Sequence, residues 1–311
     1  MFNKSIKCSL SLAVVVFGVT GSFMKGQCPS PGPSAVQVGW WDCVQNWPIQ
    51  AVHMVQLHTG KVLAFNSNFH VVFDPVTKTC NGSSPGTCTT FLAVPGFQNL
   101  FCSGHSALGD GRIVFYGAIL DPDTTVIYDP DDGANGSWTL FAQPDAGRRY
   151  YPTLTTLGDG TILNTAGDVR QFEPGTASLG PSVFDPATGQ WESFCDAWWC
   201  PEGYTTCDRA PGCESSTSSP YDFNMEFYPF MFLLSNATVL YAGEDEPAGV
   251  PIRTKRLLTS GDGYWQDVVA SDDPIHGGSA VMYRPDKVMK AGGRLLEDTG
   301  SVRPPRLPIA P

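Results

Sequence analysis

One pattern of hydrophobic and polar positions recurs along the chain. Each copy has a short apolar run, a tight turn and a second apolar run that ends in small residues. Apolar runs of this length, bounded by turn residues, predict β-strands paired as hairpins, and no long amphipathic helical pattern accompanies them. The first runs and their turns are 52–57 with Thr59-Gly60, 106–108 with Asp110-Gly111, 153–157 with Asp159-Gly160, 230–234 with Asn236-Ala237, and 279–282 with Pro285-Asp286.

The spacing of these turns predicts a repeat architecture. Counted from Thr59, and with Asp286 as the fifth point, the intervals are 51, 49, 77 and 50 residues. A period near 50 is typical of kelch-type β-propeller blades, each a four-stranded sheet that needs neighbours to cover its faces. A β-sandwich is the alternative all-β fold, but it has no reason to repeat at this period. We predict an all-β, kelch-type β-propeller with about four blades and part of a fifth, over residues 51–293.

Cys102 and Tyr151 stand in matching places of two neighbouring repeats. Each lies eight residues before its Asp-Gly turn, and the same count gives Ala51, Tyr228 and Gly278 in the other copies. The start of the innermost strand of a propeller blade lines the mouth of the central channel. We therefore expect Cys102 and Tyr151 side by side at that mouth. A thiol beside a phenol suggests radical chemistry.

The N-terminus has the features of a secretory signal peptide, which we place at 1–22. Lys4 and Lys7 precede the apolar run 9–19, and small residues follow at 18–22. The run is short for a membrane-spanning helix, although a retained anchor is the alternative. We predict a secreted, extracellular protein with no membrane attachment after cleavage, in which 23–50 form a segment before the first blade.

Cysteine counting fits an oxidising compartment. Ten cysteines are present, and Cys8 leaves with the signal peptide, so one of the remaining nine stays outside any intramolecular pair. Cys28 could pair with Cys43, Cys80 with Cys88, and the four cysteines of a 195–213 insertion with one another, which leaves Cys102. Connectivity does not follow from sequence, and zinc is the other interpretation of the four-cysteine group.

Composition excludes several function classes. The net charge of −11 leaves no basic surface for nucleic acid or an anionic membrane. The sequence also has no phosphate-binding glycine loop and no serine-nucleophile motif.

Two segments resemble the cysteine and tyrosine strands of the galactose oxidase and glyoxal oxidase family of copper-radical oxidases. They are Phe101-Cys102-Ser103-Gly104-His105, followed by Leu108-Gly109-Asp110-Gly111, and Arg149-Tyr150-Tyr151-Pro152, followed by Leu157-Gly158-Asp159-Gly160. In the second segment, Tyr150 stands where the family has a tryptophan. Residues 228–231 and 278–283 also resemble blades of that family. The resemblance runs from about residue 50 to about residue 293.

The resemblance implies a cofactor and a reaction. Cys102 and Tyr151 would be joined by a thioether, and the Tyr151 phenolate would bind copper. Oxidation of a primary alcohol or aldehyde removes two electrons, of which copper(II) accepts one and the thioether-modified tyrosyl radical the other. Molecular oxygen would then be reduced to hydrogen peroxide. The expected partners are a small-molecule or carbohydrate substrate and O2, and we expect a monomer.

The sequence also departs from the family. Members have seven blades and three more copper ligands: a Tyr-His pair on a later blade and a histidine in a C-terminal domain. No Tyr-His pair occurs here, and none of the five histidines lies in a matching segment: His53, His58, His70, His105 and His276. We expect an incomplete chain, through truncation or a frameshift before the tail 294–311, that is inactive as given. A non-catalytic kelch propeller that binds carbohydrate or protein is the alternative function.

Four other features have competing interpretations. Tyr228 fits the core or channel mouth better than a ligand position, and His105 fits a structural role. Arg148 and Arg149 suit loop anchoring, with a role beside the phenolate as the alternative. Trp198-Trp199 predicts a hydrophobic cluster held by disulfides, with a sugar-stacking platform as the alternative.

Overall fold

The computed structural model describes most of the repeat region and little of the chain ends. The described residues are 32, 47, 49–67, 69–80, 91–92, 99–118, 124–133, 135–141, 149–167, 180–199, 212–213, 215–221, 225, 227–244, 254–268 and 278–291. The predicted signal peptide and the tail 294–311 lie outside them, as do Cys28, Cys43, Cys88, Cys200 and Cys207. The chain divides into two units, Met1–Gln45 and Asn46–Pro311, and every strand belongs to the second.

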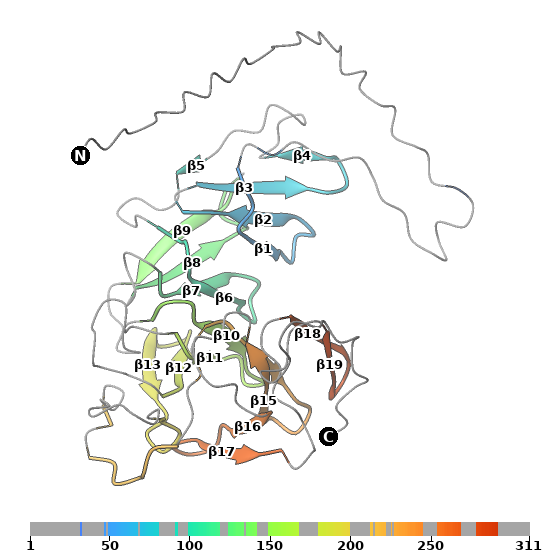
Figure 1. Cartoon of the computed structure of the whole chain (residues 1–311). Coiled ribbons are helices and arrows are strands. Elements are labelled where there is room, and N and C mark those ends of the chain that lie inside the picture. Colours follow the sequence, from blue (N-terminus) through green and yellow to red (C-terminus); the bar gives the residue numbers. More distant parts are fainter. Residues whose placement is uncertain are drawn as a thin grey trace, which may run out of the picture. The chain divides into compact units, whose positions relative to one another are not determined.

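The described residues form five antiparallel sheets and no helix (Figure 1). We call these sheets blades 1 to 5 in chain order. Blade 1 contains β1 (His53–Gln56), β2 (Val62–Phe65), β3 (Phe69–Asp74) and β4 (Thr79–Cys80), and β5 (Phe91–Leu92) also pairs with β3. Blade 2 contains β6 (Gly104–Ala107), β7 (Ile113–Tyr116), β8 (Thr125–Asp129) and β9 (Ser137–Phe141).

The remaining blades repeat this meander. Blade 3 contains β10 (Thr153–Thr156), β11 (Ile162–Thr165), β12 (Ser182–Asp185) and β13 (Gln190–Ser193). Blade 4 contains β14 (Pro229–Leu233), β15 (Val239–Glu244), β16 (Lys255–Leu258) and β17 (Tyr264–Asp267). Blade 5 has β18 (Ser279–Arg284) and β19 (Lys287–Ala291). The all-β propeller prediction, with four blades and part of a fifth, is confirmed. No helix capable of crossing a membrane is found among the described residues.

The same hairpin loop joins the first two strands of blades 1 to 4. In blade 2, the Gly111 N–H donates to the Leu108 carbonyl at 3.0 Å, and the Leu108 N–H donates to the Arg112 carbonyl at 2.8 Å. Gly111 has a φ of 93°, so this is a three-residue loop that ends in a left-handed residue. The Asp110 carboxylate accepts the Arg112 N–H at 3.1 Å. The Asp-Gly pair seen in the sequence therefore occupies the second and third positions of this three-residue loop.

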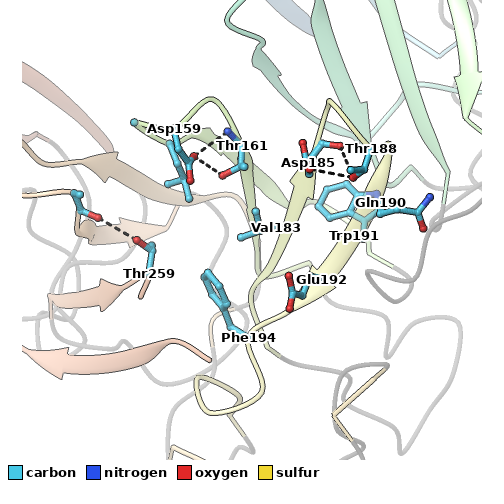
Figure 2. Close-up of a pocket in the computed structure, with 13 residues that line it drawn as sticks. Asp159, Thr161, Val183, Asp185, Thr188, Gln190, Trp191, Glu192, Phe194 and Thr259 are labelled. Atoms are coloured by element: carbon cyan, nitrogen blue, oxygen red, sulfur yellow. Dashed lines mark hydrogen bonds between the residues drawn. The ribbon is translucent and has the colours of Figure 1, made fainter. Parts of the chain in front are cut away.

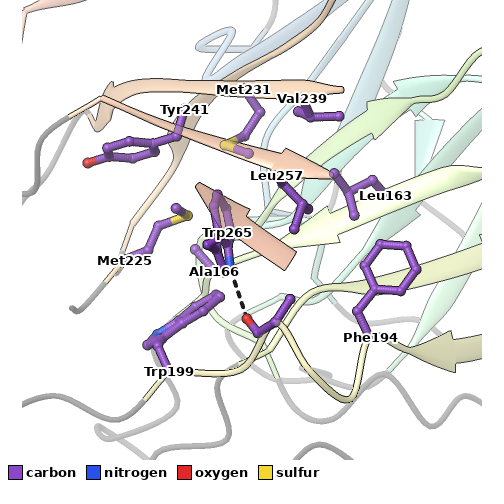
Figure 3. Close-up of a cluster of buried hydrophobic side chains, with 11 residues drawn as sticks. Leu163, Ala166, Phe194, Trp199, Met225, Met231, Val239, Tyr241, Leu257 and Trp265 are labelled. Carbon is purple, nitrogen blue, oxygen red and sulfur yellow. Dashed lines mark hydrogen bonds between the residues drawn. The ribbon is translucent and has the colours of Figure 1, made fainter. Parts of the chain in front are cut away.

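Neighbouring blades pack through apolar faces that neither could bury alone. Separate clusters of buried side chains join blade 1 to blade 2, blade 2 to blade 3, blade 3 to blade 4, and blade 4 to blade 5. The cluster between blades 3 and 4 includes Leu163 of β11, Tyr241 of β15 and Trp265 of β17 (Figure 3). The first strands of blades 2, 3, 4 and 5 contact one another in that order.

The segment between blades 3 and 4 contributes to this core. Trp199 is fully buried, Trp198 is 8% exposed, and the Trp265 indole N–H donates to the Ala197 carbonyl at 2.7 Å (Figure 3). A disulfide joins Cys195 to Cys213. The predicted hydrophobic cluster is confirmed, and the sugar-stacking alternative is wrong because both indoles are buried. Cys200 and Cys207, which would form the second disulfide of the insertion, lie outside the described residues.

We predict that Ala237→Gly stabilises the protein by about 1 kcal/mol, because Ala237 occupies the left-handed loop position at a φ of 63° and glycine adopts this conformation without strain. Gly160→Ala is the matched control in blade 3, where the φ is 88° and a methyl group would meet no atom within 4 Å. It should destabilise by a similar amount. Urea unfolding measures both, and a destabilising Ala237→Gly would contradict the prediction.

Candidate functional site

A residue one or two positions before the first strand has the same unusual backbone in four successive blades. Cys102, Tyr151, Tyr228 and Gly278 have φ values of 72°, 62°, 41° and 81°. Only glycine adopts this region freely, so the side-chain-bearing members are strained and must be held by their surroundings. The Tyr151 N–H donates to the Cys102 carbonyl at 3.0 Å, and the Tyr228 N–H donates to the Tyr151 carbonyl at 2.8 Å. These bonds place the predicted pair, Cys102 and Tyr151, on adjacent blades in contact.

The side chains of the pair also meet. The Tyr151 phenol is hydrogen-bonded to the Cys102 thiol and to the Tyr150 side chain. Cys102 is a reduced thiol and is fully buried. Burial, followed by these two hydrogen bonds, raises the pKa of Tyr151 well above its usual value. The phenol therefore stays protonated at neutral pH unless a bound cation or a covalent change lowers its pKa.

Tyrosine rings stack against Tyr151. The Tyr150 ring lies 4.1 Å from it, centroid to centroid, at an interplanar angle of 27°, and the Tyr228 ring lies 4.8 Å away at 32°. Phe227 meets the Tyr151 ring edge-on at 5.3 Å. Aromatic pairs at these separations attract one another beyond their area burial. Tyr150 thus contacts Tyr151 through both its ring and its hydroxyl group.

A cavity of about 480 Å³ opens beside this pair. Its lining includes Cys102, Tyr151, Tyr228 and two histidines, His53 and His105. Burial lowers the pKa of each histidine to about 4, and for His53 the proximity of His105 lowers it further. Both imidazoles are therefore neutral at pH 7. No sequence motif marks either histidine as a site residue, although His53 lies two residues after Ala51, the blade 1 equivalent of Cys102.

Arg149 anchors the strand entry that carries Tyr150 and Tyr151. Its side chain is fully buried, and the guanidinium donates to the Ala166 carbonyl at 3.1 Å and to the Gly180 carbonyl at 2.6 Å. Burial lowers the pKa of Arg149 to about 10, so it remains charged at neutral pH. Gly117 packs against it, since a methyl group there would lie 2.8 Å from the Arg149 carbonyl oxygen. These contacts are those of the predicted loop anchor, and Arg148 lies outside the described residues.

Another cavity, of about 490 Å³, lies among the hairpin loops of blades 3 and 4 (Figure 2). Asp159 and Asp185 line it, but both carboxylates accept hydrogen bonds from their own loops, from Thr161 and Thr188 respectively. The Trp191 indole N–H donates to Thr125 at 2.9 Å. These polar groups already form hydrogen bonds within and between blades. This cavity is therefore a weaker candidate for a catalytic site than the cavity beside Tyr151.

Any metal site in the cavity beside Tyr151 would have to use the tyrosine phenols. Among the described residues, no three or more His, Cys, Asp or Glu side chains are grouped to hold a metal ion. The cavity beside Tyr151 instead offers phenol oxygens and neutral imidazoles. The His53 Nε2 atom is buried and has no hydrogen-bond partner among the described residues. Imidazole is a favoured ligand of copper, so these donors are compatible with that metal.

The structure resembles solved propellers at low sequence identity. A fungal alcohol oxidase of the AA5 family, determined in complex with copper, matches with a TM-score of 0.58 and 19% identity over 81% of this chain and 48% of the oxidase. This chain therefore spans about half the length of that protein. A virginiamycin B lyase from Staphylococcus aureus matches with a TM-score of 0.43 and 12% identity over 82% of this chain and 69% of the lyase.

The first likeness supports the propeller fold, and the second is too distant to add to it. No protein-family model matches the sequence, and no curated protein matches it either.

We predict that Arg149→Lys lowers the free energy of unfolding by about 2 kcal/mol, because one ammonium group cannot satisfy carbonyls that the planar guanidinium reaches together. Urea unfolding measures this change. Arg112→Lys is the control, since its ion pair with Asp110 is near the surface and should matter by less than about 1 kcal/mol. An equal effect of the two substitutions would contradict the anchoring role.

The buried histidines predict a loss of stability in acid. His105 has a pKa of about 4 in the folded protein and about 6.5 when unfolded, so the unfolded chain binds more protons between these values. The free energy of unfolding should therefore fall as pH drops from about 6.5 to 4, by about 1.4 kcal/mol per pH unit for this group. Urea unfolding of His105→Gln should show a shallower dependence. Phe115→Leu, at the adjacent ring, should lower stability without changing the slope.

Proposed function

We propose that this chain forms the propeller of a secreted copper-radical oxidase, which oxidises a primary alcohol or aldehyde with O2 and produces hydrogen peroxide. The observation that carries the proposal is the hydrogen-bonded contact between the Cys102 thiol and the Tyr151 phenol beside a cavity. The sequence resemblance to copper-radical oxidases and the propeller fold support it. Secretion rests on the signal peptide predicted at 1–22, and we expect a monomer.

Cys102 and Tyr151 are placed to form the cofactor from their own atoms. A thioether between Sγ and the ring carbon next to the phenol oxygen removes one hydrogen atom from each residue. Molecular oxygen takes up both hydrogen atoms as hydrogen peroxide, so atoms and electrons balance. The sulfur substituent then delocalises an unpaired electron on the ring and makes its oxidation easier. The strained backbone at both residues limits the orientations that the two side chains can adopt.

Tyr151 is also the residue that would hold copper. A bound cation would lower the pKa of its phenol, which burial raises in the metal-free protein. When bound, copper(II) accepts one of the two electrons that the substrate gives up, and the modified tyrosine accepts the other. The Tyr150, Tyr228 and Phe227 rings contact the Tyr151 ring and restrain its orientation, and the neighbouring Cys102 is fully buried.

The cavity limits the substrate to a small molecule or the end of a carbohydrate. Its volume of about 480 Å³ lies in the usual range of small-molecule sites. The resemblance places further copper ligands in segments that this sequence does not match. We therefore expect the 311-residue chain to form the thioether without sustained turnover.

Peptide mass spectrometry tests the proposal after the purified chain is loaded with copper(II) in air. We predict one linked peptide that contains Cys102 and Tyr151 and is lighter than the sum of its parts by two hydrogen atoms. Cys102→Ala and Tyr151→Phe should abolish the link, and Tyr264→Phe, at an exposed tyrosine, should retain it. Separate peptides with an intact thiol would contradict the proposal and favour a non-catalytic propeller that binds carbohydrate or protein.

A further inference from the structure

We propose that Asn236 is a site of N-linked glycosylation, on the hairpin loop between the first two strands of blade 4. The chain has three motifs of the form Asn-X-Ser/Thr: Asn81-Gly82-Ser83, Asn135-Gly136-Ser137 and Asn236-Ala237-Thr238. Such a motif is used only in a chain that enters a secretory compartment, so this inference rests on the secretion in the proposed function. It goes beyond the oxidase reaction, because it assigns a carbohydrate modification to one of the motifs.

The first support is the exposure of the loop. Ser235, Asn236 and Ala237 form the β14–β15 hairpin loop, in which the Ala237 N–H donates to the Leu234 carbonyl at 3.0 Å, and all three loop residues are exposed. A linked glycan is a bulky hydrophilic group that needs a surface position. The exposed loop provides one.

The second support is the orientation of the Asn236 amide. Its Oδ1 atom accepts the Thr238 N–H at 3.2 Å and the Thr238 hydroxyl at 2.7 Å. A backbone N–H can only donate, so the amide atom that faces Thr238 is the oxygen and not the nitrogen. The Nδ2 atom, to which a glycan would be attached, lies on the other arm of the planar amide and is not used by this contact.

The third support is the contrast with Asn135, the other motif within the described residues. The Asn135 Oδ1 atom is buried without a hydrogen-bond partner among the described residues, and the Asn135 carbonyl accepts the Tyr128 hydroxyl at 2.7 Å. A methyl group on Gly136 would collide with the same Tyr128 hydroxyl. The Asn135 loop is therefore packed onto the blade 2 ring, and Asn236 is the better glycosylation site of the two. Asn81 lies outside the described residues.

The position of the loop keeps a glycan away from the candidate site. Tyr228 lines the cavity and comes just before β14, whereas Asn236 lies beyond the other end of that strand. The five residues of β14 span about 17 Å of extended backbone. The thioether-linked peptide should therefore form equally in Asn236→Gln and in the parent protein.

Expression of the full chain in a eukaryotic host that glycosylates secreted proteins tests this inference. One form keeps its own N-terminus, and a second form has an established cleavable signal peptide in place of residues 1–22. Protein is collected from the secretory compartments and the medium together. Peptide N-glycosidase converts a glycosylated asparagine to aspartate, and heavy-oxygen water labels the converted residue for mass spectrometry. We expect this label at Asn236.

Matched variants identify the motif that is used. Asn236→Gln and Thr238→Val should each remove one glycan, whereas Thr238→Ser keeps the hydroxyl group and should retain it. Asn135→Gln is the matched change at the second motif and should leave the Asn236 glycan in place. The glycosidase should release this glycan from the folded protein without denaturant, because the loop is exposed. An unmodified Asn236 in both forms of the chain, or a glycan there only in aggregated protein, would overturn the inference.

The readouts separate this inference from the proposed function. A glycan at Asn236 in the form with the foreign signal peptide, but not in the form with its own N-terminus, would uphold the site and contradict the predicted secretion. A glycan at Asn236 together with separate Cys102 and Tyr151 peptides after copper loading would uphold the site and contradict the radical cofactor. A linked Cys102–Tyr151 peptide with an unmodified Asn236 in both forms would leave the oxidase proposal standing and overturn the glycosylation site.

Discussion

The structure depends on the packing of each sheet against the next. A four-stranded blade has two apolar faces, and burial of those faces is the main favourable contribution to its folding. Four separate clusters of buried side chains join the five described blades in sequence order. This packing brings the first strands of blades 2 to 5 together, although they are separated by about 50 residues or more along the chain. The site beside Tyr151 is a consequence of that contact.

The backbone conformation just before the first strands determines which side chains meet where the blades contact one another. Cys102, Tyr151 and Tyr228 all adopt left-handed φ values, and hydrogen bonds from one blade to the next hold them there. Each of these residues precedes the first strand of its blade, and its left-handed backbone differs from the extended backbone of a strand. The strain is offset by the packing of whole blades. In blade 3, the buried Arg149 side chain donates hydrogen bonds to two backbone carbonyls and so anchors the segment just before the first strand.

Burial gives the site its electrostatic character. The Tyr151 phenol is protonated, the neighbouring imidazoles are neutral, and the fully buried Cys102 thiol lies against the phenol. A cation bound at the Tyr151 phenol would have to displace the phenol proton, because only the phenolate offers a negative charge.

Much of this protein follows from sequence alone. The recurring apolar runs and the turns near 50-residue intervals determined the propeller and the position of each hairpin, because blade formation depends on local pattern and a fixed period. The equal distance of Cys102 and Tyr151 from their turns indicated that the two would be neighbours, because equivalent positions of stacked blades come together. Only the tertiary structure placed His53 on the same cavity, buried Trp199 in the core, and stacked Tyr150 and Tyr228 on Tyr151. These features arise from contacts between blades and from the burial of individual side chains. Such contacts leave no repeating pattern in a single sequence from which they could be predicted.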